Sequence, residues 1–169
     1  MTITAPQTSA PPSVSLQPTG WLRYLSFSVD HKVIGLQYLV CGFAFYLIGG
    51  AMAGAIRTEL LSPVSDFMPR DVYNQILTLH GTVMIFLWIV PVVNGAFGNY
   101  LIPFYVGARD MAYPRLNAVA FWLIPPAGLM LISSYFITGA AQSGWTAYPP
   151  LSITTPAAGQ IIWILSVLL

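Results

Sequence analysis

Two long stretches of this chain contain no charged side chain, and this feature limits its fold more than any other. The first covers residues 33–56 and the second residues 72–108. A helix needs about 20 mostly apolar residues to cross a lipid bilayer. Charge-free runs of this length therefore predict membrane-spanning helices.

The composition of the whole chain agrees with a membrane location. Only 7% of the 169 residues are charged and 56% are hydrophobic, whereas about 25% of the residues of a soluble domain are charged. Too little polar surface is left to coat a soluble globule. The net charge of +1 also excludes a nucleic-acid partner on electrostatic grounds.

The apolar segments predict an all-α, polytopic transmembrane helix bundle. We place full spans at about residues 33–56, 72–100 and 116–138, and the start of a fourth at 160–169, where the chain stops before that span is complete. The second charge-free run is too long for one span, so the helix must end early, and Asn94, Gly95, Gly98, Asn99 and Pro103 are expected to mark its fraying end. Pro91 falls inside this span and is expected to kink it.

The first 20 residues differ from the rest of the chain. They are uncharged and rich in Pro, Ser and Thr, a composition typical of a disordered tail. They have neither the basic region nor the apolar region of a secretory signal. Residues 21–169 are therefore expected to form the membrane domain.

The distribution of basic residues predicts the orientation in the membrane. Basic residues gather on the cytoplasmic side of membrane proteins. One side of the predicted bundle has Arg23, Lys32, Arg109 and Arg115, and the other has only Arg57 and Arg70. The N-terminus and the loop around residue 109 are therefore expected to face the cytoplasm.

One histidine lies in the apolar second span, in the segment "NQILTLHGTVMIFLWIVP". His80 is about two turns, or roughly 12 Å, from the outer end of this span. A buried imidazole must form a hydrogen bond or bind a ligand. It either bonds a neighbouring helix or interfacial water, or it coordinates a metal or haem iron.

Residues near His80 favour the haem alternative. Gly81 has no side chain, so a flat macrocycle could approach the helix there, and Thr78 and Thr82 supply hydroxyls nearby. Arg57 ends the first span on the same outer side, where its guanidinium could meet an acidic or polar ring substituent. Its alternative role is an ordinary interfacial anchor.

A polar cluster is predicted at the cytoplasmic ends of the second and third spans, formed by Asn94, Asn99, Asp110 and Asn117. Asp110 is either a loop carboxylate paired with Arg109 or Arg115, or the entrance of a proton pathway. In the second case, asparagine amides would order a water chain toward the interior. No carboxylate lies inside the predicted spans, so the proton acceptor is expected in another part of the protein.

Several long motifs follow one another between Asp30 and Ser152. They are "DHKVIGLQYL", "IRTEL", "YNQILTLHGTVMIFLWIVP", "GAFGNYLIPFYVGARDMAYPRLN", "FWLIPP" and "GWTAYPPLS". In this order they resemble the opening third of subunit I of the haem–copper terminal oxidases, particularly the cyanobacterial cytochrome c oxidases. The "DHK" and "GARD" segments also resemble the quinol-oxidising branch.

The resemblance implies roles for residues at the outer end of the bundle. His80 would be one axial ligand of the low-spin haem, Arg57 would face a substituent of that haem, and Trp145 would lie by its propionates. Glu59 would belong to a peripheral cation site. Val64 stands where the family has a glycine at that site, so the likeness is incomplete there.

The resemblance also implies a proton route at the other end. Asp110 would be the mouth of the D pathway, and Asn99 and Asn117 would line its first stretch. Many family members have proline where this chain has Arg109. We expect a cation beside Asp110 to alter proton capture.

The resemblance further implies that most of the catalytic machinery lies beyond this sequence. Subunit I has about twelve spans, and its second low-spin haem ligand, high-spin haem ligand, copper-binding histidines and histidine-linked tyrosine come later. This chain has two histidines, and His31 is expected in a cytoplasmic segment before the first helix, as an interface residue. We therefore expect a fragment that is inactive alone. Its expected partners are the remainder of subunit I, subunits II and III, and the lipids of a cyanobacterial cell or thylakoid membrane.

The implied activity of the whole protein is reduction of dioxygen to water with electrons from cytochrome c, coupled to proton pumping. The high-spin haem and copper belong to the complete subunit. These residues do not decide between cytochrome c and quinol as the electron donor. One rival is a non-catalytic haem-binding membrane anchor that takes its second ligand from another chain. A transporter fragment is the other rival, and it is disfavoured because no span contains a charged residue.

Overall fold

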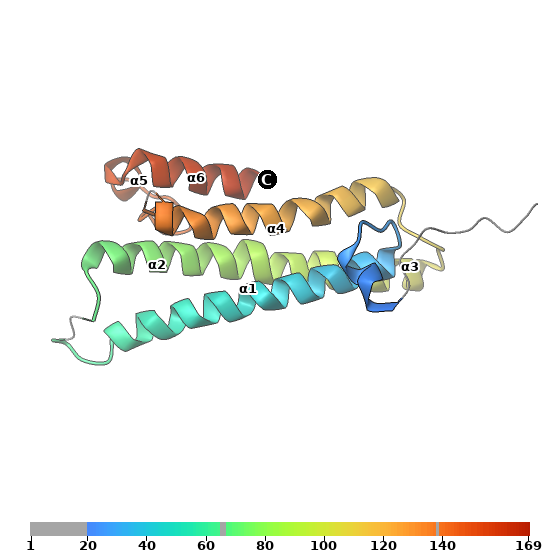
Figure 1. The fold of residues 1–169 in the computed structure, drawn as a ribbon, viewed down its shortest axis with the longest axis horizontal. Helices are drawn as coiled ribbons and strands as arrows, with labels where there is room; N and C mark the ends of the chain where they lie inside the picture. The colour runs from blue at the N-terminus through green and yellow to red at the C-terminus, as the bar shows by residue number, and fades with distance from the viewer. Residues whose placement is uncertain (1–19, 65–66, 138) are drawn as a thin grey trace, which may run out of the picture.

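The computed structural model describes residues 20–64, 67–137 and 139–169, and every regular element among them is helical. Successive long helices run antiparallel to one another, side by side (Figure 1). The expected disordered tail, residues 1–20, lies outside the described residues except for Gly20, where the first short helix begins.

Three helical stretches are long and apolar enough to cross a membrane, namely α1, the continuous stretch Arg70–Val106 and α4, and α6 is a shorter apolar helix. The all-α membrane bundle with three full spans is thus confirmed. The elements in chain order are the 3-10 helix η1 (Gly20–Leu25), α1 (His31–Glu59), α2 (Arg70–Thr82), the π-helical η2 (Val83–Ile89) and η3 (Pro91–Gly98), α3 (Asn99–Val106), α4 (Pro114–Ile137), α5 (Leu151–Thr154) and α6 (Ala157–Leu168).

Helix α1 begins at His31, whereas the sequence placed this residue before the helix. The cause is the cap at Asp30, whose side chain accepts a hydrogen bond from the backbone N–H of Lys32 at 2.9 Å. An aspartate at this position satisfies a backbone donor that has no partner within the helix. His31 therefore belongs to the first turn of α1.

The second span differs from its prediction in length and in geometry. It runs on to Val106, although the end was expected near residue 100, because the polar Asn99 is buried and its side chain bonds Gly95 within the same stretch. The irregularity expected at Pro91 takes the form of π-helical segments, which accommodate a residue without an N–H. The span ends at Gly107, whose φ of 72° suits a glycine cap.

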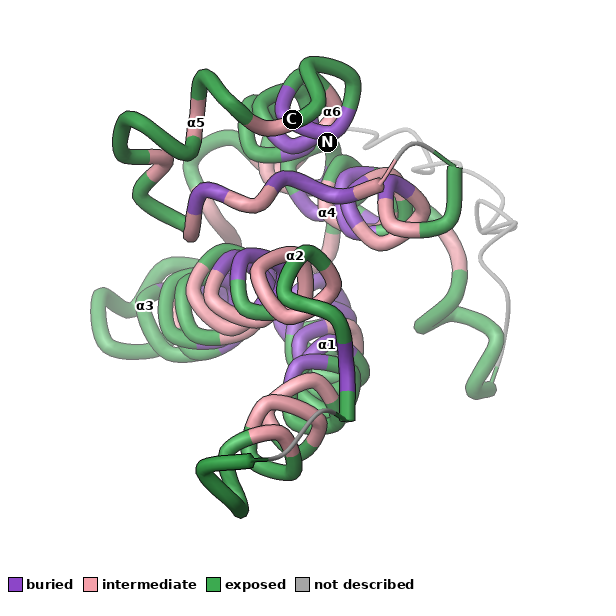
Figure 2. The backbone as a smooth tube through the Cα atoms, turned by 90° about the vertical axis from the view of Figure 1, so that its left-hand side faces the viewer, coloured by how far each residue is buried: buried purple, intermediate pink, exposed green. Residues whose placement is uncertain are grey.

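The core lies where α1, the second span and α4 meet, and α6 lies against α4 (Figures 1 and 2). One buried cluster contains Phe45, Leu79, Val83, Leu87 and Leu131, and a second contains Ile34, Tyr38, Ala96, Ala118 and Phe121. Small residues let these helices approach closely, as is common between membrane helices.

The bundle has two distinct ends (Figure 1). The turn between α1 and α2, the segment 139–150 and α5 lie at one end. Helix η1 and the loop between α3 and α4 lie at the other. Arg57, in the last turn of α1, therefore shares an end with Trp145, and Asp110 shares the opposite end with η1.

Candidate functional site

His80 extends from α2 to the backbone of α1. Its Nδ1 lies 2.9 Å from the carbonyl oxygen of Gly49, and the side chain is half-buried. A carbonyl only accepts hydrogen bonds, so Nδ1 carries the hydrogen in this pair. The lone pair of Nε2 is then free to act as a ligand, and no hydrogen bond to Nε2 is found among the described residues.

This arrangement suits a metal-binding imidazole. Histidines that coordinate metals usually donate their other N–H to a carbonyl or carboxylate, which fixes the ring and raises the basicity of the ligating nitrogen. The sequence left open whether His80 bonds a neighbouring helix or binds a metal. One ring nitrogen forms the bond to the neighbouring helix, and the other remains free. The one free imidazole nitrogen fits a single ligand of haem iron or of another metal atom.

Gly49 makes the contact between α1 and the second span possible. A Cβ atom at this position would lie 2.7 Å from Sδ of Met84 and 3.3 Å from Cγ1 of Val83. The missing side chain leaves room for the side chains of Met84 and Val83 at the point where the Gly49 carbonyl meets His80. Sequence reasoning missed this residue, although the pair Gly49-Gly50 inside an apolar span is a signal of close helix packing.

The space beside Gly81, where the sequence left room for a macrocycle, is lined by Trp145. A Cβ atom at Gly81 would lie 3.0 Å from Cδ1 of the indole. The same indole packs edge-to-face against Phe86, with ring centroids 6.3 Å apart. Gly81 thus accommodates the indole of Trp145. Since Gly81 directly follows His80 in the chain, the indole lies beside the histidine.

The threonines also have a different role from the one expected. The hydroxyl of Thr78 accepts a hydrogen bond from the backbone N–H of Gly144 at 2.9 Å, and that of Thr82 accepts one from Nε1 of Trp163 at 2.8 Å. An α-helix turns about 100° per residue, so Thr78 and Thr82 share the face opposite His80. They attach α2 to the segment 139–150 and to α6.

Arg57 and Glu59 lie in the last turn of α1. Arg57 is exposed, and no ion pair involving it is found in the described part of the chain. Oε2 of Glu59 accepts a hydrogen bond from the backbone N–H of Met68 at 3.0 Å, beside a cavity also lined by Arg70 and Tyr73. Val64 is 89% exposed and does not line this cavity.

At the opposite end, a chain of hydrogen bonds joins three helices through Asn99. Its Oδ1 accepts a hydrogen bond from Nδ2 of Asn117 in α4, its Nδ2 donates to the Gly95 carbonyl at 2.6 Å, and its own carbonyl lies 2.8 Å from Nδ1 of the buried His31 in α1. Two predicted proton-pathway residues are thus in direct contact. Asn94 is exposed, and no side-chain hydrogen bond of it is found among the described residues.

Asp110 lies half-buried in the loop between α3 and α4. Its Oδ1 accepts a hydrogen bond from the backbone N–H of Met111 at 2.8 Å. Among the described residues it forms no ion pair with Arg109 or Arg115. The structure therefore does not show the alternative role of Asp110 as half of an ion pair. No described hydrogen bond joins Asp110 to Asn99 or Asn117 either.

The described residues hold no group of three or more His, Cys, Asp or Glu side chains that could bind a metal ion together. His80 is therefore a single donor, and any metal group that it binds must take its other ligands elsewhere.

Comparison with known proteins identifies the family. Residues 33–169 match the family model described as Cytochrome C and Quinol oxidase polypeptide I. The chain is 61% identical to cytochrome c oxidase subunit 1 of Thermostichus vulcanus and 62% identical to that of Synechocystis sp., over 88% of this chain in each case. It is also 41% identical to cytochrome c oxidase subunit 1 of Corynebacterium efficiens, over 89% of the chain. It spans 27% of the length of each of these relatives, and it belongs to the cytochrome c and quinol oxidase polypeptide I family.

Proposed function

We propose that this chain forms the N-terminal part of the catalytic subunit of a respiratory oxidase and supplies one axial ligand of its low-spin haem. The observation that carries the proposal is the bond from Nδ1 of His80 to the Gly49 carbonyl. It fixes the ring and leaves Nε2 as the ligating atom. When bound, the haem would supply one-electron transfer.

Two further side chains are proposed to border the haem. Arg57 lies at the same end of the bundle as the segment that holds Trp145, and Trp145 packs on Gly81, the neighbour of the ligand. The exposed guanidinium is free to bind an anionic or polar substituent. The indole covers the helix surface beside His80 and keeps water from it.

The opposite end is proposed to admit protons. Asp110 is the collecting group, and the bonded pair Asn99 and Asn117 lies at the meeting point of α3 and α4. Since Asp110 has no ion-pair partner among the described residues, its carboxylate is free to exchange protons with water. This end, with the N-terminus, would face the cytoplasm of a cyanobacterial cell or the equivalent side of its thylakoid membrane.

In the complete protein, electrons from cytochrome c would reduce dioxygen to water while protons are pumped. The names of the relatives support cytochrome c as donor. The remaining haem ligand, the high-spin haem and copper would belong to the rest of subunit I, and subunits II and III would be its partners. The Glu59 region is proposed as a peripheral cation site on the basis of the resemblance.

The substitution His80→Ala in the complete oxidase tests the haem assignment. It should abolish the reduced absorption band of the low-spin haem, because alanine offers no ligand. His31→Ala is a matched control, since His31 is also a helical histidine with Nδ1 on a backbone carbonyl. It should keep the band. A normal band at normal haem content in His80→Ala would show that His80 has a structural role only.

A further inference from the structure

Two cavities adjoin each other at the end of the bundle that carries η1. One measures about 670 Å³ and lies between α1 and η3, and the other measures about 510 Å³ and lies between α1 and α3. Lys32, Tyr100 and Leu101 line both. The two cavities therefore adjoin at Lys32, Tyr100 and Leu101, and we call them together the furrow.

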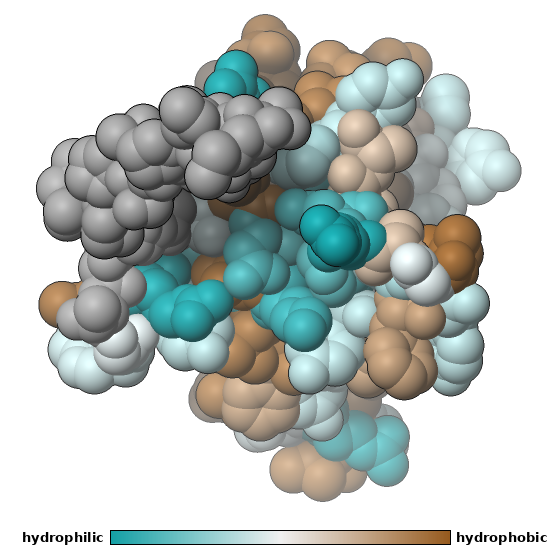
Figure 3. Space-filling model, turned by 90° about the vertical axis from the view of Figure 1, so that its right-hand side faces the viewer, coloured by the Kyte–Doolittle hydropathy of each residue, from teal (hydrophilic) through white to brown (hydrophobic). Residues whose placement is uncertain are grey.

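Basic side chains dominate the mouth of this furrow. Arg23 and Lys32 line the first cavity, and Lys32 and Arg109 line the second, which has no carboxylate among its lining residues. All three basic residues are exposed. Figure 3 shows this end of the molecule, where hydrophilic surface gathers across the centre and hydrophobic surface lies around it.

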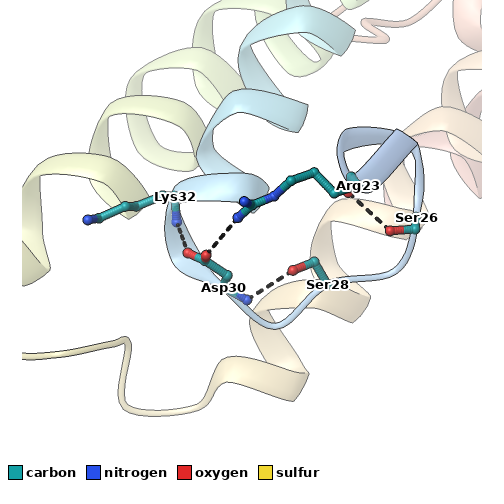
Figure 4. A network of polar contacts seen from close by, with 5 residues as sticks. All are labelled: Arg23, Ser26, Ser28, Asp30 and Lys32. Atoms are coloured by element: carbon teal, nitrogen blue, oxygen red, sulfur yellow. Dashed lines mark hydrogen bonds and ion pairs between the residues drawn. The ribbon is translucent and has the colours of Figure 1, made fainter. Parts of the chain in front are cut away.

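The single acidic group at the mouth is already occupied. Oδ2 of Asp30 lies 3.2 Å from Nη2 of Arg23, and Oδ1 accepts the backbone N–H of Lys32 (Figure 4). The Lys32 side chain points away from this pair (Figure 4). No ion pair to Lys32 or Arg109 is found in the described ranges of the chain, so two positive charges face the furrow without a partner.

Apolar residues form the deeper wall. Val33, Leu36 and Leu39 come from α1, and Ala96 and Phe97 come from η3. These residues follow the two helices from the mouth into the membrane-spanning part of the bundle. Leu36, Leu39 and Phe97 are 38%, 37% and 52% exposed, so their side chains leave apolar surface to be covered.

We propose that this furrow binds an anionic glycerophospholipid. Lys32 and Arg109 hold the headgroup phosphate, and one acyl chain lies along Leu36, Leu39 and Phe97. Basic pockets between membrane helices on the cytoplasmic side are suited to anionic headgroups. An apolar helix in the same place would bury two cations without a counter-charge, which is costly in a membrane. A free phosphate ion would leave the apolar wall uncovered.

The test uses the complete oxidase in vesicles that contain a phosphatidylglycerol probe with a photoactivatable acyl chain. After illumination, mass spectrometry should find the label on the peptides that contain Leu36, Leu39 or Phe97. Lys32→Gln should reduce this labelling about fivefold, the effect of one basic residue near an anionic lipid surface. Lys32→Arg should retain it, and excess inorganic phosphate should leave it unchanged.

Arg115→Gln is the matched control, because Arg115 is an exposed basic residue at the same end that lines neither cavity. It should label like the unmodified protein. The proposal would be overturned if Lys32→Gln were labelled as strongly as the unmodified protein. It would also be overturned if a phosphatidylcholine probe labelled the protein as strongly as the phosphatidylglycerol probe. Loss of labelling on adding inorganic phosphate would also overturn it, because the site would then bind a free anion. An absence of label on these peptides would overturn it too, because another polypeptide segment would then cover the furrow.

Discussion

At the scale of single residues, the two ring nitrogens of His80 have different surroundings. One is bonded to Gly49 and the other has no described partner. An imidazole at membrane depth must satisfy its polar atoms, and the single carbonyl satisfies only the donor. The arrangement leaves Nε2 of His80 available to a ligand, as a metal-binding imidazole requires.

Arg57 allows a prediction at the same scale. If its guanidinium bonds a haem substituent, it withdraws electron density and stabilises the reduced haem. Arg57→Met should therefore shift the low-spin absorption band and lower the reduction potential, as measured by spectroelectrochemical titration. Arg70→Met removes another exposed basic residue at this end and should change neither. An unaltered band and potential in Arg57→Met would leave Arg57 as an interfacial anchor.

At the scale of elements, the packing of α1 on the second span depends on where glycines fall. Gly49 is buried against Val83 and Met84, while a Cβ at the adjacent Gly50 would meet no atom within 4 Å. Two neighbouring glycines thus have opposite environments. Only the first packs against side chains of the second span, beside the bond to His80.

The pair provides an internally controlled experiment. Gly49→Ala should push α1 away from η2, at a cost of about 1–3 kcal/mol for overpacking, and should lower both the thermal midpoint and the haem content of the purified oxidase. Gly50→Ala should be neutral or stabilise by up to about 1 kcal/mol, because alanine favours the helix. If both variants bind haem and unfold alike, Gly49 does not set the distance between α1 and His80.

At the scale of the whole molecule, the antiparallel arrangement separates the residues of the two proposed sites. His80, Arg57 and Trp145 belong to the half of the bundle near the α1–α2 turn, while Asp110 lies at the end that holds η1 (Figure 1). The proposed haem ligand and the proposed proton entrance therefore lie toward opposite ends of the bundle.

Cysteine labelling can test this arrangement in the membrane. In a background with Cys41→Ala, Val64→Cys and Ala108→Cys place exposed thiols at opposite ends. An impermeant thiol reagent should reach position 108 only from the cytoplasmic side and position 64 only from the other. If both positions were labelled from one side, the stretch between them would not cross the membrane.

Asp110 allows a functional prediction for the complete enzyme. Asp110→Asn keeps the shape of the side chain but removes the charge that attracts protons at the mouth. Oxygen reduction and proton pumping should both fall severely, while the haem spectrum remains normal. Asp71→Asn, which alters an exposed carboxylate in the first turn of α2, should not change turnover. Full turnover and pumping in Asp110→Asn would mean that protons enter elsewhere.

The sequence by itself determined the helical bundle and its number of full spans. A bilayer forces backbone groups to bond within each span, so charge-free length decides the fold locally. It also singled out His80, because a polar side chain is conspicuous in an apolar run. The predicted end of the second span was wrong because a polar residue was taken as a sign of a fraying helix end. Asn99 is instead buried, and its side chain is hydrogen-bonded inside a helix that continues.

Only the tertiary structure decided which groups meet. It placed the Gly49 carbonyl on His80, filled the space beside Gly81 with Trp145, and turned Thr78 and Thr82 toward the segment 139–150 and α6. These contacts depend on how far each helix is rotated and shifted along its neighbour. Helix rotation and offset are set by packing between residues far apart in the chain. The local pattern of hydropathy therefore cannot predict them.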